Sequence, residues 1–428
     1  MNSKWKYALV GLLVAGLGLI VLWRISGESL ARIVKQQLLQ TASTSVNGVL
    51  SVGTVEFSMS GSLVADHVEL RDKSGVLIAA ARTLTIDLDM SDLLSRRLDI
   101  SRIRKLTLDG LVLHIKRNKD LRWNITETTT QTPATPTAVF RGKIHAVKAI
   151  VTVETTESRY DFKNVDGTID FANYPNLAMD LRSTSGASEL IAKGTWDFNK
   201  GGKIQVSANK TELGSFVPNI PLQGPITAKF ALEGTTDKPT VAGSFQIPEG
   251  NLDNTVFSDA QGNFSLTGST LSLSGVKTNA LGGSIAVNGP VAIDTLRYSL
   301  KLSGQNVDSA YLSDKDIRGR LGFSADAQGQ GFKGGTAADG SFQMGAGSIS
   351  GVAFDALTGN FAKRGAQVRY YNIRVTIAGQ TIYIGDADSL DDLKIPFLKL
   401  VLPGVVPAVP KLPQVPALPK LPALPRLF

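Results

Sequence analysis

Apolar and polar residues alternate along most of the chain beyond residue 50. Leu84, Ile86, Leu88 and Met90 are separated by threonine and aspartate, and Leu106 and Leu108 by Thr107. A period of two is typical of a strand with one dry and one wet face. The pattern recurs at Leu111/Leu113/Ile115, Val151/Val153, Ile169/Phe171, Ile204/Val206, Leu271/Leu273, Ile285/Val287, Leu300/Leu302 and Ile382/Ile384. It predicts a mainly β protein.

Turn signals punctuate these runs. They are Asp109-Gly110, Asp166-Gly167, Gly201-Gly202, Gly282-Gly283, Asn288-Gly289 and Asp339-Gly340. Helical signals are few: a capped turn is expected at Ser91 and another at 307–312. Strands do not alternate with helical segments, so an antiparallel or meandering sheet is expected.

The N-terminus has a different pattern. Residues 7–25 are apolar except for Arg24, with aromatic residues at both ends. About 20 such residues cross a bilayer core. Trp23-Arg24-Ile25 follows the apolar run where a cleavage site would need small residues, which favours an uncleaved anchor over a signal peptide. Residues 29–40 have helical spacing and predict a short membrane-surface helix. The positive-inside rule is nearly balanced, and we expect the body to lie outside the cytoplasm.

Composition divides the chain further. Residues 126–138 are rich in threonine and proline and predict a linker. From 407 to 425 a proline returns at every third position, the period of polyproline II. The expected division is an anchor at 1–25, an N-terminal module at 26–125, the linker at 126–138, a β-body at 139–393 and a proline-rich tail at 394–428.

The body contains an internal repeat. Gly243-Ser-Phe-Gln returns 97 residues later as Gly340-Ser-Phe-Gln, and nine of the 22 positions from 243 to 264 are identical in the second copy. Repeats in an all-β chain stack into an extended sheet with local neighbours. At ~11 residues for each strand and turn, the body gives ~23 strands and a sheet ~110 Å long. We expect an elongated, groove-like, taco-shaped sheet.

Charge and composition exclude several classes of protein. The chain has no cysteine, which excludes disulfides, zinc-thiolate sites and thiol catalysis. Its net charge of +8 lies at the two ends, since residues 131–393 hold 23 basic and 25 acidic residues. Aromatic residues are sparse in both basic ends, so an anionic membrane surface or an anionic polymer is expected as partner and nucleic acid is not; charge that serves only solubility is the alternative.

Catalytic motifs are nearly absent. His67, His114 and His145 are scattered without metal-ligand spacing, and we interpret them as solvated or structural residues. The G-x-G-x-x-G match at 329–334 lies between expected strands and predicts a loop. The acidic residues at 386–392 lack calcium-loop spacing. We expect no enzymatic activity, no cofactor and no metal.

Two parts of the chain resemble a known family. The first is the run of strands from Leu84 to Leu113 followed by Leu121-Arg-Trp-Asn-Ile125, and the second is Asp339-Gly340-Ser-Phe with Gly347–Gly351. They are similar to the N-terminal and C-terminal modules of AsmA/TamB-like proteins, although Leu121 stands where glycine is common. The resemblance implies an inner-membrane anchor, a groove-shaped β-structure in the periplasm, and a role in carrying phospholipid towards the outer membrane or in outer-membrane assembly.

Candidate site residues follow from the apolar runs and the densest basic cluster. The lipid-groove candidates are Leu84, Ile86, Leu88, Leu106, Leu108, Ile285, Val287, Leu300 and Leu302. The headgroup candidates are Arg96, Arg97, Arg102, Arg104 and Lys105; a solvated outer strand face is the alternative interpretation of this cluster. An envelope scaffold with a closed apolar face is the alternative function. The tail is expected to dock its valine and leucine edge into a groove, either that of an outer-membrane or envelope protein or the protein's own, and a plain linker is the alternative. A homo-oligomer is a further possible assembly.

Overall fold

The computed structural model describes residues 48–58, 62–87, 102–118, 122–124, 140–155, 159–197, 199–212, 222–235, 238–253, 255–311, 317–331 and 335–388. Strands make up 80% of them, so the chain is mainly β, as the alternation predicts. The anchor, the linker and the tail lie outside the described residues.

The strands of the first half are β1 (Gly48–Val52), β2 (Val55–Phe57), β3 (Ser62–Asp72), β4 (Leu77–Asp87), β5 (Lys105–Asp109), β6 (Val112–Lys116), β7 (Lys143–Glu154), β8 (Arg159–Asp170), β9 (Asn176–Ser185), β10 (Ser188–Asp197), β11 (Gly201–Glu212), β12 (Leu222–Gln223) and β13 (Pro225–Gly234). Those of the second half are β14 (Pro239–Leu252), β15 (Thr255–Thr267), β16 (Thr270–Ala280), β17 (Gly283–Ala292), β18 (Arg297–Asp308), β19 (Ile317–Arg318), β20 (Arg320–Gln330), β21 (Ala337–Met344), β22 (Gly347–Ile349), β23 (Val352–Phe354), β24 (Ala356–Arg364), β25 (Gln367–Ile377) and β26 (Gln380–Ala387). A 3-10 helix, η3 (Ser309–Tyr311), falls within the helical turn expected at 307–312.

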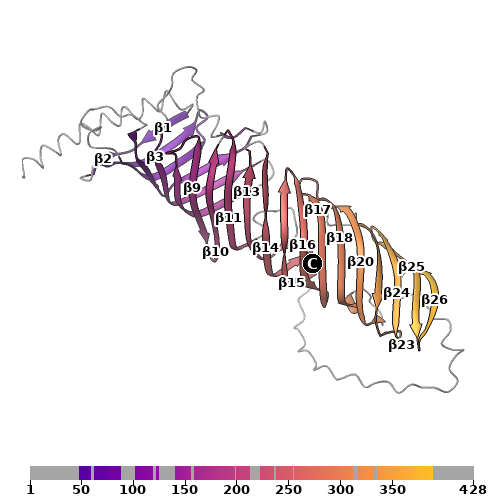
Figure 1. Cartoon of the computed structure of the whole chain (residues 1–428). Coiled ribbons are helices and arrows are strands. Elements are labelled where there is room, and N and C mark those ends of the chain that lie inside the picture. Colours follow the sequence, from indigo (N-terminus) through magenta and orange to yellow (C-terminus); the bar gives the residue numbers. More distant parts are fainter. Residues whose placement is uncertain are drawn as a thin grey trace, which may run out of the picture.

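One 23-stranded sheet contains every described strand except β19, β22 and β23. From β7 to β26 the pairings are antiparallel, and strands that follow one another along the chain are mostly neighbours. Figure 1 shows the result, a sheet whose strands succeed each other along the long axis of the molecule. The expected meander is therefore confirmed.

The N-terminal strands join this sheet through a parallel step. β4 pairs with β5 and β6, which are separated by a turn at Gly110, and both then run parallel to β7. Parallel neighbours need a crossover connection of a dozen or more residues. Residues 117–142, which include the threonine- and proline-rich linker, supply that connection. The main sheet thus continues from the expected N-terminal module into the body.

The described residues of the body form fewer strands than the sequence predicts. β7 to β26 are twenty strands, and four of them, β12, β19, β22 and β23, add only two or three residues each. At ~4.8 Å for each strand, the sixteen longer ones give ~75 Å. Three of the expected turns are wrong, because Gly167, Gly289 and Gly340 lie within β8, β17 and β21. A Cβ atom at any of them would lie within 2.3 Å of a backbone oxygen of a neighbouring strand, so glycine there permits close pairing.

A row of β-bulges crosses the sheet. Residues with positive φ interrupt the strands at Lys148, Asn164, Asp259, Gly275, Asn306 and Asn372. The residue that follows each is buried: Ala149, Val165, Ala260, Val276, Val307 and Ile373. A bulge bends its strand and shifts the inward-facing positions by one residue. We call this line the bulge row, the face with these buried residues the core face, and the other the polar face.

The 97-residue repeat is also a structural repeat. In the first copy β14 pairs with β15 and places glycine opposite phenylalanine three times, and β21 to β24 repeat all three pairs in the second copy. The pairs are Gly243–Phe264, Phe245–Gly262 and Gly250–Phe257, followed by Gly340–Phe361, Phe342–Gly359 and Gly347–Phe354. Six of the nine identical residues are therefore the glycines and phenylalanines of these pairs, in which a ring lies across the neighbouring strand.

The second copy differs from the first in where its strands are interrupted. There the strands stop at the bulge row, and β19, β22 and β23 form a separate three-stranded sheet. Ile317, Ile349 and Phe354 of this small sheet pack against Leu357 and Val375 of the main sheet, and all five are buried. At the C-terminal end the core face is thus covered by protein.

Candidate functional site

The four candidates in β17 and β18 lie together on the core face. Val287 pairs directly with Leu302, and Ile285 pairs with Gly304. Leu300 lies two residues before Leu302 and therefore on the same face. All four side chains are half-buried, and Ile285 packs against the C-terminal cluster around Val307. The structure thus joins these residues into one apolar patch.

The N-terminal candidates occupy a different environment. Leu84 pairs with Leu108 and Ile86 with Leu106, so the four share a face of β4 and β5. Ile86 is only 3% exposed because it packs in a cluster with Leu63 and Ile103. It is a core residue of the N-terminal strands and is covered by protein. Leu88 lies outside the described residues.

Between β8 and β18 the described part of the chain places no second layer on the core face. Substantial contacts there join only strands that pair or adjoin in the sheet. Side chains such as Leu232, Leu266 and Leu273 remain half-buried. The sheets of ordinary domains bury an apolar face against another layer. A cluster of Ala208, Ile226, Ala228, Ile247 and Ala260 is buried in this stretch, but the half-buried apolar side chains beyond it have no second layer over them among the described residues.

The described headgroup candidates are partly solvent-exposed. Arg102 and Arg104 are exposed on either side of Ile103, which points into the N-terminal cluster, and Lys105 begins β5 half-buried. Arg96 and Arg97 lie outside the described residues. Nearby cations have structural partners: Lys116 Nζ lies 2.6 Å from Glu154 Oε1, and the Arg117 guanidinium lies 5.4 Å from the Trp123 ring centre.

The Trp123-Asn124 signature holds the crossover against the edge of β6. Asn124 accepts a hydrogen bond from the backbone N–H of Lys116 at 2.9 Å and donates one to the carbonyl of His114 at 2.8 Å. Arg117 and Trp123 form an isolated antiparallel bridge. The side chain of Asn124 thus replaces a strand partner, and in this chain the signature has a structural role.

Three carboxylates reinforce the joint between β6, β7 and β8. The Lys116 ammonium lowers the pKa of Glu154, a hydrogen bond from the buried Thr152 hydroxyl lowers the pKa of Asp161, and a backbone N–H of Ala172 lowers the pKa of Asp170. Each carboxylate is therefore stabilised in its charged form. We therefore interpret these carboxylates as structural residues that stabilise the sheet.

Titratable groups do not converge elsewhere in the described residues. His145 Nδ1 lies 3.0 Å from the Thr168 hydroxyl across β7 and β8, whereas His67 occupies a left-handed position in β3. The described residues contain no group of three His, Asp or Glu side chains that could hold a metal ion. Asp386 pairs with Arg369 at 2.9 Å, and Asp391 and Asp392 lie outside the described residues.

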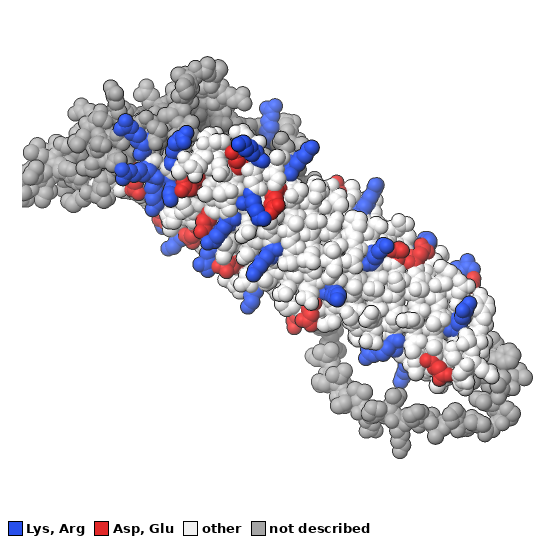
Figure 2. Space-filling view, viewed as in Figure 1, with Lys and Arg blue, Asp and Glu red and all other residues white. Residues whose placement is uncertain are grey.

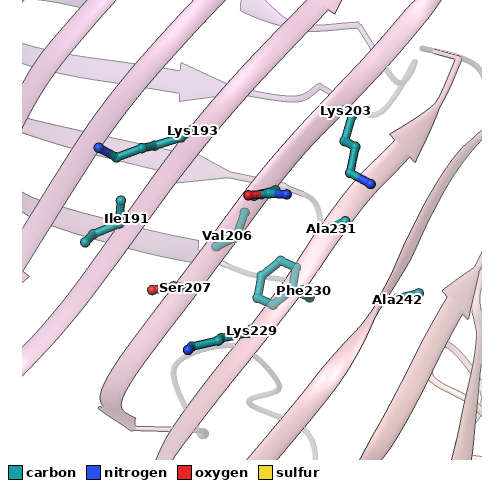
Figure 3. Close-up of a pocket in the computed structure, with 10 residues that line it drawn as sticks. Ile191, Lys193, Lys203, Val206, Ser207, Lys229, Phe230, Ala231 and Ala242 are labelled. Carbon is teal, nitrogen blue, oxygen red and sulfur yellow. The ribbon is translucent and has the colours of Figure 1, made fainter.

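A pocket of about 400 Å³ lies on the polar face, and its side chains are shown in Figure 3. Lys193, Lys203 and Lys229 line it together with small and apolar residues of β10 to β14. Lys193 pairs with Asp180 at 2.9 Å and Lys203 with Glu233 at 2.6 Å. The paired carboxylates neutralise two of the three ammonium groups, so the pocket has little net charge.

Comparisons with protein-family models, curated proteins and solved structures returned no match. The likeness to AsmA/TamB-like proteins therefore rests on the residues named in the sequence. Among the residues that the structure describes, no helix is long and apolar enough to cross a bilayer, and residues 7–25 are outside them.

Proposed function

We propose that the protein is an inner-membrane-anchored periplasmic carrier that holds phospholipid acyl chains along its core face and moves lipid between the inner and outer membranes. The observation that carries this proposal is the half-buried apolar side chains on the core face from β8 to β18, over which the described residues place no second layer. Exposure of such a surface to water costs roughly 25 cal/mol of free energy for each Å². Acyl chains match it because they are linear, apolar and need no hydrogen-bonding partner from the wall.

The finer architecture belongs to this proposal. The bulge row bends the strands along one line, which supports a groove with the core face inside. The anchor at 7–25 would hold the N-terminal strands at the membrane, and Arg102, Arg104 and Lys105 would lie near the headgroups. A lipid could then enter from the anchored end and travel along the sheet.

Site-specific crosslinking in cells tests this function. Benzoylphenylalanine replaces Leu300 on the core face in one variant and its exposed neighbour Ser299 in the other, and phospholipid is labelled with ³²P. We expect labelled lipid to crosslink at position 300 and little at 299. Equal labelling at the two positions, or none at position 300 with intact protein, contradicts the proposal.

A second candidate is a non-enzymatic scaffold for outer-membrane protein assembly. It is favoured by the C-terminal end, where the small sheet already covers the core face with protein side chains. A scaffold would close the rest of that face on a partner protein. In the same experiment it gives a protein crosslink at position 300 in place of the lipid.

A further inference from the structure

A second hollow lies on the polar face, at the far end of the sheet from the N-terminus. It is an open cleft of about 1120 Å³ formed by β18, β20, β21, β24 and β25. Its exposed lining residues, such as Ser341 and Gln343 of β21, alternate with the buried core residues Phe342 and Met344. Successive side chains of a strand point to opposite faces, so the cleft is on the side away from the core face.

Small residues and bulges make this hollow. Gly322, Ser303 and Ser324 contribute short side chains or none to the lining, whereas longer side chains from Arg320, Gln343 and Arg374 stand beside them. The positive-φ residues Asn306 and Asn372 also line the cleft, one on β18 and the other on β25. The cleft thus lies where two bulges of the bulge row interrupt their strands.

The lining is positively charged. It includes two guanidinium groups, Arg320 and Arg374, and no aspartate, glutamate or lysine. Arg320 Nη1 donates to the carbonyls of Gly282 at 2.8 Å and Asn306 at 3.1 Å, which fixes its position at the rim. Its nearest carboxylate, Asp308, is 3.9 Å away. The exposed Arg374 has no hydrogen bond or ion pair from its side chain among the described residues.

Most of the other lining side chains that are not glycine are polar and uncharged, and the cleft is also lined by Leu321, Phe323, Phe342, Met344 and Ala356. Hydroxyl groups come from Ser303, Ser324, Ser341 and Thr358, and side-chain amides come from Gln305, Asn306, Gln343, Asn360 and Asn372. Hydroxyls and amides both donate and accept hydrogen bonds, as the hydroxyls of a sugar do. A planar guanidinium forms bidentate hydrogen bonds with phosphate or carboxylate. Binding pockets for drug-sized ligands occupy ~300–1,000 Å³, so the cleft has room for more than one sugar ring.

We propose that this cleft binds an acidic saccharide, that is, a sugar that carries a phosphate or carboxylate group. Arg374 holds the anionic group, whereas Arg320 lies three strands away, at the rim beside β18, and adds positive charge. The hydroxyls of Ser303, Ser324 and Ser341, which we call the floor of the cleft, and the side-chain amides bind the ring hydroxyls. The site is on the opposite face from the acyl chains of the proposed function, so the two proposals can fail independently.

Isothermal titration of the full-length protein in detergent tests the site. The probes are glucose 6-phosphate, glucuronate, glucose and inorganic phosphate. We expect at least one of the two acidic sugars to bind more tightly than either glucose or inorganic phosphate. The better of the two then identifies phosphate or carboxylate as the recognised group.

Two variants assign the binding to the cleft. Arg374→Gln should weaken binding of the better acidic sugar by about tenfold or more, because it removes a charged bidentate partner. Arg369→Gln is the matched control: it removes the same charge from an exposed residue of β25 that pairs with Asp386 and does not line the cleft. Both substitutions are exposed, and thermal unfolding checks that the fold is kept.

A third variant separates the contribution of the sugar ring to binding from that of the anionic group. Ser324→Leu fills the floor and leaves both arginines, so it should reduce the affinity for the acidic sugar to that for inorganic phosphate. No measurable binding of either acidic sugar overturns the proposal, and so does equal affinity in Arg374→Gln, Arg369→Gln and the parent protein.

Discussion

Phe361 of β24 lies opposite Gly340 of β21, and its ring occupies the space that a side chain at position 340 would need. A methyl group there would lie 2.7 Å from the Phe361 Cζ and 2.3 Å from the carbonyl oxygen of Ser324. The same register joins Gly243 to Phe264 in the first copy of the repeat. The ring shields a strand position that has no side chain of its own.

Gly340→Ala should therefore destabilise the C-terminal half of the sheet. The added methyl group meets backbone on one side and an aromatic ring on the other, so we expect a loss of ~1–3 kcal/mol in the free energy of unfolding. Urea denaturation followed by circular dichroism measures it. Gly345→Ala is the control, because no atom lies within 4 Å of the new methyl group. Equal stability of the two variants would show that the glycine–phenylalanine pair is not under steric constraint.

The period-two pattern predicts the strands well, because one face of the sheet is apolar along its whole length. It does not predict where a bulge shifts the inward-facing positions by one residue. Tyr370 and Ile373 both point to the core face although they are three residues apart, since Asn372 between them forms a bulge. Asparagine, aspartate, lysine and glycine all take this conformation here, so the type of amino acid does not predict the position of a bulge. Glycines are equally ambiguous, because close strand pairing and turns both require them.

The candidate site also has some features that the sequence predicts and others that it does not. The pairing of Val287 with Leu302 follows from two neighbouring apolar runs that alternate in phase. The covering of Ile86 does not follow, because Ile103 comes from an irregular segment with no period of its own. The acidic-saccharide cleft leaves no sequence signal either. Its arginines are 54 positions apart, and its serine and glutamine residues, which are common types, come from strands that are distant in the sequence.

Charges on the core face should displace lipid. We predict that the double variant Ile285→Asp with Leu300→Asp loses most of the phospholipid crosslinking at position 302, because acyl chains cannot solvate carboxylates. The control is Ser284→Asp with Ser299→Asp, which places the same charges on the exposed face of the same two strands. Unchanged crosslinking in the core-face variant would rule out a lipid-filled groove.

Acid should weaken the joint between β6, β7 and β8. The pKa values of Glu154, Asp161 and Asp170 are lower in the folded protein than in the unfolded chain. Their stabilising contribution is therefore complete above the unfolded pKa of about 4 and is lost as the pH falls through the folded values. We expect the melting temperature to fall between pH 5 and pH 3.

Asp161→Asn tests the origin of that fall. It removes the charge that the Thr152 hydroxyl stabilises at 2.7 Å, so the melting temperature should depend less on pH than in the parent protein. Asp326→Asn, at an exposed position of β20, serves as the control. The account is wrong if the parent protein and Asp161→Asn respond to acid identically.

The N-terminal segment should keep the protein in the membrane. We predict that the full chain stays in the pellet after carbonate extraction and that its N-terminus is intact. A variant in which a cleavable secretion signal replaces residues 1–27 should appear in the soluble periplasmic fraction. Recovery of the native chain from the soluble fraction with a mature end near residue 25 to 30 would show that the segment is a signal peptide.

The tail is predicted to dock as an amphipathic rod. In polyproline II, three residues complete one turn, so the prolines from 407 to 425 occupy one edge, valine and leucine residues such as Val409 and Leu412 the second, and Lys411 and Lys420 fall on the third. A plain linker would not need an apolar residue at strict period three. Deletion of 403–428 should leave the sheet folded and the chain anchored while lowering function, as measured by complementation of a deletion strain. A Gly/Ser segment of equal length is the decisive control, because it keeps the reach of the tail and removes its apolar edge. If that replacement restores full function, the tail acts as a spacer and the docking prediction is wrong.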